Sequence, residues 1–307
     1  MKRLVFAAAL LCGVLFAAEP VREIKVLTIG NSFANSVMGA LRQVVAADPS
    51  CKIKIVGANL GGCSLERHWN NFAKSEKDPS FKPYAGNKKS LQELLAEDKW
   101  DIVTIQQASR LSWKPESYQP FADNLIAAVR KLAPNAEIVI QQTWSYNSAM
   151  PRLNPGDPKS WKIDQTAMYE KLTAAYLQLA KKHQLRVIPV GDAVQIFRKT
   201  MGDKLVACEP KDISGMQKPD LPKTNDVAGN FSWTTDKKTG KEKLFCDYCH
   251  LNKRGCYLQA LVWYAVICGK DPARSKFVPK NISAEEVALF KKCASEAVKK
   301  FPQVNSN

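Results

Sequence analysis

Histidine and acidic residues are scarce in this sequence, and long apolar stretches are absent beyond its N-terminus. Only 3 of the 307 residues are histidine, and 29 Asp and Glu stand against 45 Lys and Arg, which gives a formal net charge of +16 at pH 7. After the first twenty residues, no stretch approaches the roughly 18 uninterrupted apolar residues that a membrane-spanning helix needs. A polytopic membrane protein is therefore excluded.

Glycine and proline are also modest, at 15 and 17 residues, while 45% of the residues are apolar. This composition is that of a folded globular chain and is too apolar for a disordered one. The positive charge favours an acidic partner, although its sign does not by itself choose between nucleic acid, an anionic glycan and a membrane surface. Nucleic acid is the least favoured, because the lysines are scattered and no aromatic–basic motif is present.

The first residues have the layout of a secretory signal peptide. Lys2 and Arg3 form a basic start, residues 4–16 are apolar, and Ala18 closes a small-residue cleavage site. We therefore expect residues 1–18 to be removed and the mature protein to be secreted or periplasmic.

Cysteine spacing does not reveal a bonding pattern. The sequence has nine cysteines, and all but one of them follow the predicted signal peptide. An even number in an exported chain permits disulfides, but the pairing cannot be deduced from the spacing. Buried free thiols are an equally good interpretation, especially for Cys268 and Cys293.

Short apolar segments alternate with amphipathic ones along residues 19–307. The strand-like segments are Glu23–Gly30, Lys52–Gly57, Trp100–Ile105, Glu137–Gln141 and Arg186–Gly191, and the helical ones are 36–47, 119–132, 164–183 and 255–269. This alternation predicts an α/β fold in which helices cover both faces of a mainly parallel five-stranded sheet. No internal repeat or linker divides the chain, so we expect a single domain.

Two polar segments interrupt this alternation, near residues 145–163 and 203–245. The second contains an expected hairpin from Phe231–Thr235 to Lys243–Phe245. In open α/β sheets the ligand crevice lies beyond the carboxyl ends of the strands, so such loops are candidates for substrate recognition. Decorative surface insertions are the alternative.

Four polar blocks follow predicted strands or precede the helix at 255–269. They are Asn31-Ser32 after the first strand, Gly61-Gly62 after the second, Gln106-Gln107 after the third, and Asp247-Tyr248-Cys249-His250 late in the chain. Each block has a structural interpretation: the serine can cap a helix, the glycines can form a tight turn, and the glutamines can satisfy backbone groups.

The last block carries the clearest chemistry. An Asp and a His three residues apart on a turn can meet, so that the carboxylate orients the imidazole through its ring N–H. A histidine held in this way can act as a general base towards a serine hydroxyl. A serine before a helix also has its backbone N–H in a region of partial positive charge, where an oxyanion is stabilised.

Together, and in this order, the four blocks resemble the SGNH (GDSL-like) hydrolase superfamily. The closer likeness is to an uncharacterised secreted branch that shares the stretches GNSF, GGCSLERHWNN, WDIVTIQQ, QTWSY and HLNKRGCYL, found here between about Ile24 and Gly269. The resemblance implies a flavodoxin-like three-layer α/β/α sandwich and an esterase that needs no cofactor or metal.

The resemblance also implies a role for each block. Ser32 would be the nucleophile, His250 the base and Asp247 its orienting carboxylate. The N–H groups of Ser32 and Gly62 would line the oxyanion hole. The superfamily expects an Asn in Gly-x-Asn as a third donor, whereas this chain has two glutamines. We favour Gln107 over Gln106 in that role, with Ser109 not excluded.

The stretch from Cys246 to His250 also spells C-x-x-C-H, the pattern of covalent haem attachment. Its late position in an α/β pattern and the lack of a second motif for an axial ligand count against haem. A zinc site at the same residues lacks a second C-x-x-C. A local disulfide there would be compatible with catalysis.

The expected reaction is hydrolysis of an ester, with an O-acetyl or other short acyl group on a carbohydrate as the substrate, and an anionic glycan is favoured by the net charge. Substrate contacts are expected from Asn31, His68, Trp69 and Trp144, with plain packing as the alternative for the last three. Two other functions stay open: a non-catalytic glycan-binding protein on the same scaffold, and a lipid or acyl esterase.

Overall fold

The computed structural model describes residues 21–301. The predicted signal peptide at residues 1–18 lies outside the described residues. The structure therefore addresses the folded part of the chain, from just before the first predicted strand to the end of the last helix.

The central sheet is parallel throughout and has the strand order β2-β1-β3-β4-β5. Its strands are β1 (Glu23–Gly30), β2 (Lys52–Asn59), β3 (Ile102–Ile105), β4 (Glu137–Gln141) and β5 (Arg186–Ile188). This is the flavodoxin-like order of doubly wound sheets, in which ligands bind beyond the carboxyl ends of the strands. The α/β fold class predicted from the sequence is confirmed.

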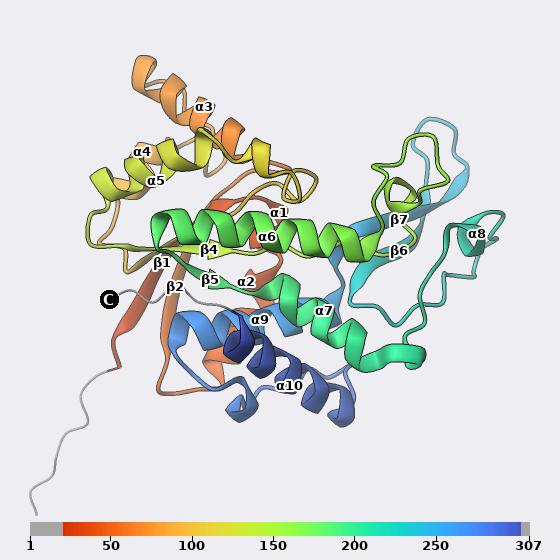
Figure 1. Cartoon of the computed structure of the whole chain (residues 1–307). Helices are drawn as coiled ribbons and strands as arrows, with labels where there is room; N and C mark the ends of the chain where they lie inside the picture. Colours follow the sequence, from red (N-terminus) through yellow and green to blue (C-terminus); the bar gives the residue numbers. More distant parts are fainter. Residues whose placement is uncertain (1–20, 302–307) are drawn as a thin grey trace, which may run out of the picture.

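Helices cover both faces of the sheet (Figure 1). One layer contains α3 (Leu65–Lys77), α4 (Leu91–Ala96), α5 (Phe121–Leu132) and α6 (Gln165–His183), and the other contains α2 (Val37–Ala46), α7 (Val190–Met201), α9 (Lys253–Cys268) and α10 (Ala284–Lys300). Two short helices, α1 (Ser32–Asn35) and α8 (Pro210–Ile213), complete the set. Within the described residues, no helix is long and apolar enough to cross a membrane.

The fifth strand is shorter than the sequence predicts. It ends at Ile188 because Pro189, which has no N–H to donate to the sheet, precedes the first residue of α7. Gly191 then lies inside that helix, where a Cβ would stand 2.2 Å from the Thr143 carbonyl oxygen. Only glycine lets α7 start so close to the end of β4.

Helix α9 is the apolar centre of its layer. Most of its residues are buried, and it packs on α2, α7 and α10. Asn252 caps its first turn by accepting from the N–H groups of Arg254 and Gly255, and Gly269 ends it in the left-handed region at φ +63°. The helix predicted at 255–269 therefore starts two residues earlier and ends one residue earlier in the structure. Helices α3, α4, α7 and α10 were not predicted.

A separate antiparallel hairpin projects from the sheet's carboxyl end (Figure 1). It consists of β6 (Ala228–Thr235) and β7 (Glu242–Leu251), and is longer than the hairpin expected in the 203–245 insertion. An isolated two-stranded hairpin is only marginally stable in water, so its base must be held by the rest of the molecule.

A buried ion pair holds the base of this hairpin. The Arg198 guanidinium on α7 lies 2.9 Å from the Asp226 carboxylate, and both side chains are 3% exposed. Arg198 also donates to the Ser145 hydroxyl at 2.7 Å and to the Tyr146 carbonyl at 3.3 Å, while Asp226 accepts from the N–H of Val227. The pair thereby ties the loop after β4 to the residues that lead into β6.

We predict that Asp226→Asn destabilises the protein by about 3–5 kcal/mol, because the Arg198 charge would be left buried without its counter-ion. Denaturant unfolding measures the loss. The matched control is Glu242→Gln, which breaks an exposed pair with Lys218 and should cost about 0–1 kcal/mol. Equal effects of the two substitutions would show that the buried pair does not hold the fold.

Candidate active site

Ser32 stands at the start of α1, directly after β1. The side chain of Asn31 caps this short helix: its Oδ1 accepts from the Phe33 N–H at 3.0 Å and from Gln106 Nε2 at 2.6 Å. Its Nδ2 donates to the Cys63 carbonyl at 3.0 Å. Asn31 is 2% exposed, so a buried amide fixes the turn that presents Ser32.

The three residues of the predicted triad form one hydrogen-bonded chain. His250 Nε2 lies 2.7 Å from Ser32 Oγ, and His250 Nδ1 lies 2.8 Å from Asp247 Oδ2. Because an ionised carboxylate can only accept, Nδ1 carries the ring proton and Nε2 accepts from the Ser32 hydroxyl. This is the tautomer that a general base needs.

Asp247 is positioned to stay ionised. Its partial burial would raise its pKa, but the His250 ring and the N–H groups of Cys249 and His250 donate to the carboxylate, and together they hold the pKa below its ordinary value. Asp247 Oδ1 accepts both backbone N–H groups, at 2.9 and 3.1 Å, and leaves Oδ2 for the ring.

An irregularity in the hairpin brings His250 to Ser32. In the ladder, Ala228 pairs with Leu251 and Asn230 pairs with Asp247, so the three residues 248–250 face a single residue of β6. Such a bulge bends the strand and redirects side chains out of the ladder. The spacing of Asp247 and His250 predicts a turn, whereas both residues lie on a bulged strand in the structure.

The loop after β4 clamps the bulge from the other side. Trp144 Nε1 donates to the Cys249 carbonyl at 2.8 Å, and the Asn147 N–H donates to the Tyr248 carbonyl at 2.9 Å. The Trp144 ring is stacked on Phe33 with the ring centroids 4.1 Å apart, and Phe33 meets the His250 ring edge-on at 5.1 Å. The nucleophile's helix and the base's strand are thus packed against the same tryptophan.

The glycine turn is fastened to the segment before Ser32. The Leu60 N–H donates to the Gly30 carbonyl at 3.1 Å, and the Cys63 carbonyl accepts from Asn31, so Gly61 and Gly62 lie between two contacts with the end of β1. Gly62 has φ +60°, a conformation that favours glycine. The resemblance implies that the Gly62 N–H lines the oxyanion hole, and this role stays a prediction.

Comparison with known proteins bears on this arrangement. Residues 25–207 match the family described as "Domain of unknown function (DUF4886)". The chain belongs to this family. The matched region contains Ser32 and the glycine and glutamine blocks but stops before the hairpin that carries Asp247 and His250.

A solved DUF4886 family protein from Bacteroides uniformis is similar over 92% of this chain and 98% of its own, with 23% identity and a TM-score of 0.69. A candidate SGNH hydrolase from Slackia heliotrinireducens is similar over 78% of this chain and 97% of its own, with 20% identity and a TM-score of 0.47. The acetylxylan esterase Axe2 from Geobacillus stearothermophilus is similar over 84% of this chain and 100% of its own, with 13% identity and a TM-score of 0.47. No curated protein matches the chain. The three-layer α/β/α fold with a parallel five-stranded sheet, which the motif order implied, is confirmed.

The glutamine block does not take the place expected of it in this DUF4886 chain. Gln107 Nε2 donates to the carbonyl and the hydroxyl of Ser117, at 2.9 and 3.1 Å, and its Oε1 accepts from the Leu65 N–H. Gln107 is fully buried and its amide nitrogen is bound to Ser117, so the preference for Gln107 as an oxyanion donor is wrong. Gln106 donates to Asn31 instead and orients the cap.

Two of the expected substrate contacts are also wrong. His68 is 0% exposed, and its Nε2 donates to the Gly30 carbonyl at 3.0 Å while Nδ1 accepts from the Tyr84 hydroxyl at 2.8 Å. Trp144 is likewise fully buried. Both residues are positioning residues: His68 binds the Gly30 carbonyl before Ser32, and Trp144 packs on Phe33 and binds the Cys249 carbonyl.

The other expected contacts have different outcomes. The Asn31 side chain is buried and already hydrogen-bonded to Phe33, Cys63 and Gln106. It therefore positions the turn and does not contact a substrate. Trp69 is half-buried on α3 and stacks with Phe72 at 5.4 Å, so its contact with substrate stays a prediction. Ser109, the other candidate donor, shares a hydrogen bond of 2.7 Å with the Tyr146 hydroxyl.

The haem interpretation of the C-x-x-C-H stretch fails on geometry, because both ring nitrogens of His250 are engaged by Ser32 and Asp247. Among the described residues, no group of three His, Cys, Asp or Glu side chains could hold a metal ion. The eight cysteines of residues 21–301 are free thiols. Burial raises the pKa of Cys249 to about 12, so it is a poor nucleophile beside the triad.

Sequence reasoning missed the supports of the triad. Gln259 on α9 is fully buried, donates to the Phe33 carbonyl at 2.9 Å and accepts from the Ser36 hydroxyl at 2.7 Å. Asn147 and Arg198 hold the loop after β4. The available signal was a polar residue within an apolar run, as at Gln259 between Leu258 and Ala260.

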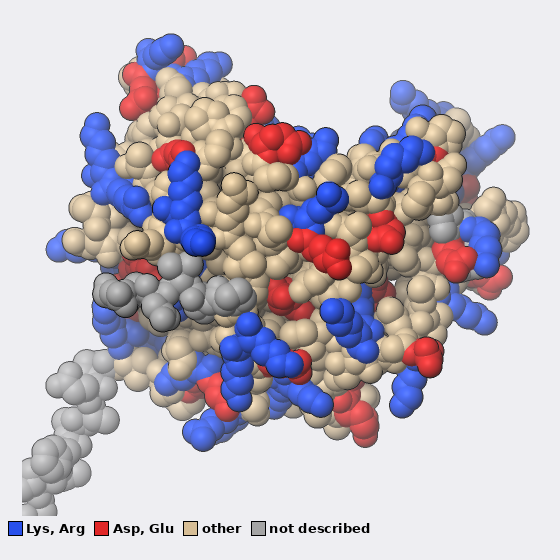
Figure 2. Space-filling model, in the orientation of Figure 1, with Lys and Arg blue, Asp and Glu red and all other residues tan. Residues whose placement is uncertain are grey.

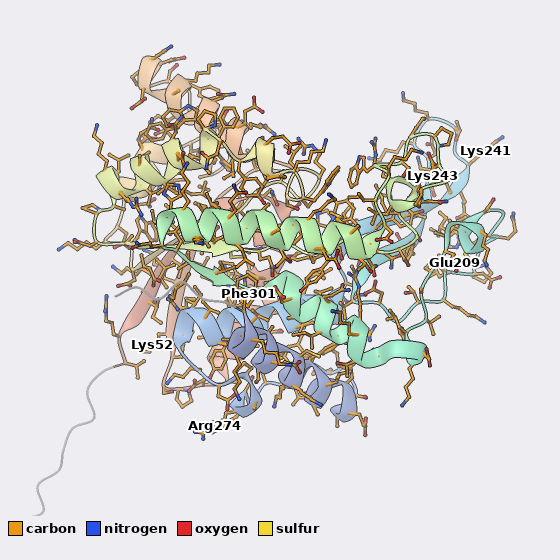
Figure 3. All side chains as sticks on the ribbon, viewed as in Figure 1. Lys52, Glu209, Lys241, Lys243, Arg274 and Phe301 are labelled. Atoms are coloured by element: carbon orange, nitrogen blue, oxygen red, sulfur yellow. The ribbon has the colours of Figure 1, made fainter. Side chains whose placement is uncertain are left out.

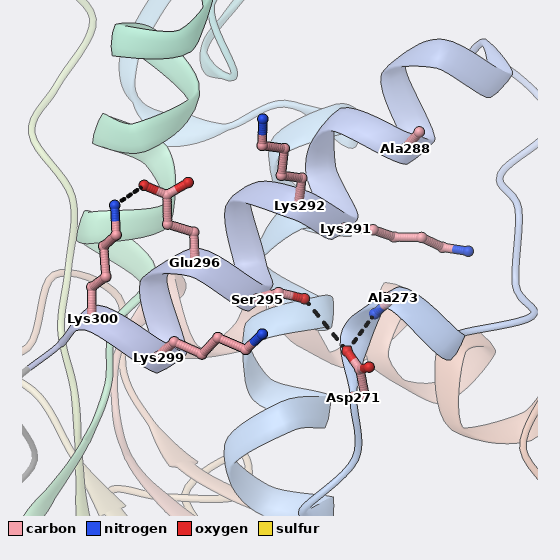
Figure 4. A pocket seen from close by; sticks show the side chains of 9 residues that line it. All are labelled: Asp271, Ala273, Ala288, Lys291, Lys292, Ser295, Glu296, Lys299 and Lys300. Carbon is pink, nitrogen blue, oxygen red and sulfur yellow. Dashed lines mark hydrogen bonds and ion pairs between the residues drawn. The ribbon is translucent and has the colours of Figure 1, made fainter.

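A hollow of about 590 Å³ lies along α10, away from the triad (Figure 4). Its lining includes Lys291, Lys292, Lys299 and Lys300, one of which is paired with Glu296. None of the triad residues lines it. Solvated lysines on one helix form an ordinary charged surface, so the chemistry stays with Ser32 and His250.

We predict that stability falls between about pH 6.5 and 4 because of His68. Burial lowers its pKa to about 4 from 6.5, so in this window the unfolded chain takes up a proton and the folded protein does not. Above pH 6.5 His68 is neutral in both states and costs no stability. As the pH falls to 4, the free energy of unfolding decreases by about 3 kcal/mol. Urea unfolding across the window checks this. An identical pH slope in His68→Gln would contradict it.

Proposed function

We propose that this protein is a serine esterase that hydrolyses a short acyl ester. The single observation that carries the proposal is the continuous chain from Ser32 Oγ through His250 to Asp247, with contacts of 2.7 and 2.8 Å. Such a chain activates a hydroxyl that is otherwise a poor nucleophile. The proposed triad also stands where the fold places ligands, beyond the carboxyl end of β1.

In the first step of the proposed mechanism, Ser32 Oγ attacks the ester carbonyl carbon while its proton passes to His250 Nε2. The imidazolium that forms is stabilised by Asp247, whose carboxylate is already hydrogen-bonded to Nδ1. The carbonyl oxygen becomes an oxyanion, and the proposed donors to it are the backbone N–H groups of Ser32 and Gly62. His250 then gives the proton to the departing alcohol, which leaves an acyl-serine.

In the second step, water attacks the acyl-serine carbonyl, and His250 Nε2 again takes the proton. Collapse of the second tetrahedral species returns that proton to Ser32 Oγ and releases the carboxylic acid. The two steps together consume one ester and one water and regenerate the resting hydrogen-bonded chain. The proposed oxyanion donors are the two backbone N–H groups, since Gln106 Nε2 donates to Asn31 and Gln107 Nε2 donates to Ser117.

We further propose that the ester is an O-acetyl or other short acyl group on a carbohydrate and that residues 1–18 direct export. Two features support a glycan substrate. The half-buried Trp69 offers an aromatic face on the helix that follows the glycine turn. Lysine and arginine side chains are also spread over the molecular surface (Figure 2), which favours an anionic polymer.

We predict that Ser32→Ala lowers the turnover of 4-nitrophenyl acetate by on the order of 10⁶, because the nucleophile is lost. The assay is the release of 4-nitrophenolate. The control is Ser50→Ala, a serine in the turn before β2, which should keep the parent rate. A scaffold that binds glycans without hydrolysing them would show no activity in the parent either, and that result would contradict the proposed function.

We predict that Asp247→Asn lowers kcat by on the order of 10⁴, because the amide can no longer hold the ring proton on Nδ1. Unfolding curves serve as the control for folding, since two backbone N–H groups also bind this side chain. A rate within tenfold of the parent would remove Asp247 from the proposed mechanism. Comparison of acetylated glycans with lipid esters as substrates separates the carbohydrate proposal from a lipid esterase.

A further inference from the structure

Two arginine side chains donate to the glycine turn beside Ser32. Arg110 Nη1 donates to the Gly62 carbonyl at 2.9 Å, and Arg67 Nη1 donates to the Gly61 carbonyl at 3.4 Å. One arginine follows β3 and the other lies on α3, so two separate segments bring guanidinium groups to adjacent residues of one exposed turn.

Both arginines face solvent without an acidic partner. Among residues 21–301, half of the arginines pair with a carboxylate, for example Arg198 with Asp226 and Arg254 with Glu286. Neither Arg67 nor Arg110 has such a pair in that part of the chain. Each guanidinium carries five N–H donors, and the turn carbonyls accept one from each.

A second observation places the two charges near the same point. Burial raises the pKa of the Cys63 thiol to about 11, and the charges of Arg67 and Arg110 both oppose that rise. Cys63 is the residue after Gly62, and its carbonyl is bonded to Asn31, the neighbour of Ser32. The two cations therefore flank the turn that adjoins the proposed nucleophile.

We propose that Arg67 and Arg110 form an anion subsite that binds an oxyanion group of the substrate, a carboxylate or a sulfate on the sugar that bears the ester. Guanidinium groups match such oxygens through paired N–H donors, and a free positive charge at the mouth of a site attracts them. This inference rests on the proposed function, since it gives the substrate of that same site its chemical class.

Placement at the turn couples recognition to catalysis. An anionic group held by Arg110 sits against the residue whose N–H is proposed to meet the oxyanion. Binding energy from a remote part of the substrate can then orient the reacting carbonyl. A neutral glycan ester would lack this contact and would be the poorer substrate.

The test begins with binding, which does not depend on turnover. Isothermal titration of the Ser32→Ala protein with oligogalacturonate, a sulfated galactan oligosaccharide and a neutral maltooligosaccharide compares the three chemistries. We expect one of the two anionic ligands to bind at least tenfold more tightly than the neutral one, and that ligand identifies the anion. Arg67→Ala and Arg110→Ala should each weaken its binding by about tenfold.

The matched control is Lys241→Ala, which removes the same unit charge from the outer end of the hairpin (Figure 3). It should leave binding unchanged if the subsite is local. Equal weakening by Lys241→Ala and the arginine substitutions, or equal binding of neutral and anionic ligands, would overturn the proposal.

Kinetics then separates this proposal from the proposed function. An acetylated uronate oligosaccharide and its carboxyl-reduced, neutral counterpart, or the sulfated and desulfated pair, are compared by acetate release. We expect the ratio of kcat/KM for the charged over the neutral substrate to fall by about tenfold in Arg110→Ala. An unchanged ratio would overturn the anion subsite while leaving the esterase intact. Absence of any acetate release would contradict the esterase, and the titrations would still decide the subsite.

Discussion

The contact between Ser32 Oγ and His250 Nε2 joins two residues that are 218 positions apart in the chain. The Asn31 cap, the bulge at residues 248–250 and the contacts of Trp144 position these two atoms 2.7 Å apart. The sheet fixes Ser32 because the end of β1 is buried and paired on both sides. The hairpin has no such support of its own, so His250 depends on clamps supplied by the loop after β4 and by α7.

The contacts that hold the hairpin are polar and buried, so each group needs a well-placed partner and its burial carries a desolvation cost. Arg198 binds Asp226 and the carbonyls of Ser145 and Tyr146 at once, and Trp144 binds the Cys249 carbonyl while stacking on Phe33. A buried charge or indole N–H that loses its partner is strongly penalised, so these contacts restrict the loop to one arrangement. The position of His250 relative to the Ser32 hydroxyl is therefore set by buried residues that do not contact a substrate.

Much of the fold and the triad could be predicted from the sequence. Alternation of apolar and amphipathic segments gave the five parallel strands, and the spacing of Asp247 and His250 gave their pairing. Their position on a bulged strand could not be foreseen, because the register with β6 depends on Asn230 and Ala228 in a distant segment. Local signals describe what a residue can do, and partners far along the chain decide what it does.

The failures have the same origin. The resemblance implies that Gln107 faces the oxyanion, but its amide nitrogen donates to Ser117 instead. The sequence predicts that His68, which follows the glycine turn, contacts the substrate, but the Tyr84 hydroxyl and the Gly30 carbonyl bind both of its ring nitrogens. The sequence does not distinguish a polar side chain that faces solvent at the edge of a sheet from one that is buried and hydrogen-bonded there.

The most direct test of the central claim is the structure of the protein after reaction with a fluorophosphonate, which forms a stable adduct on an activated serine. The account predicts phosphorus on Ser32 Oγ, with His250 Nε2 within hydrogen-bonding distance of an adduct oxygen and Asp247 still bound to Nδ1. An adduct on another residue, or a Ser32 left unmodified beside an intact His250, would contradict it.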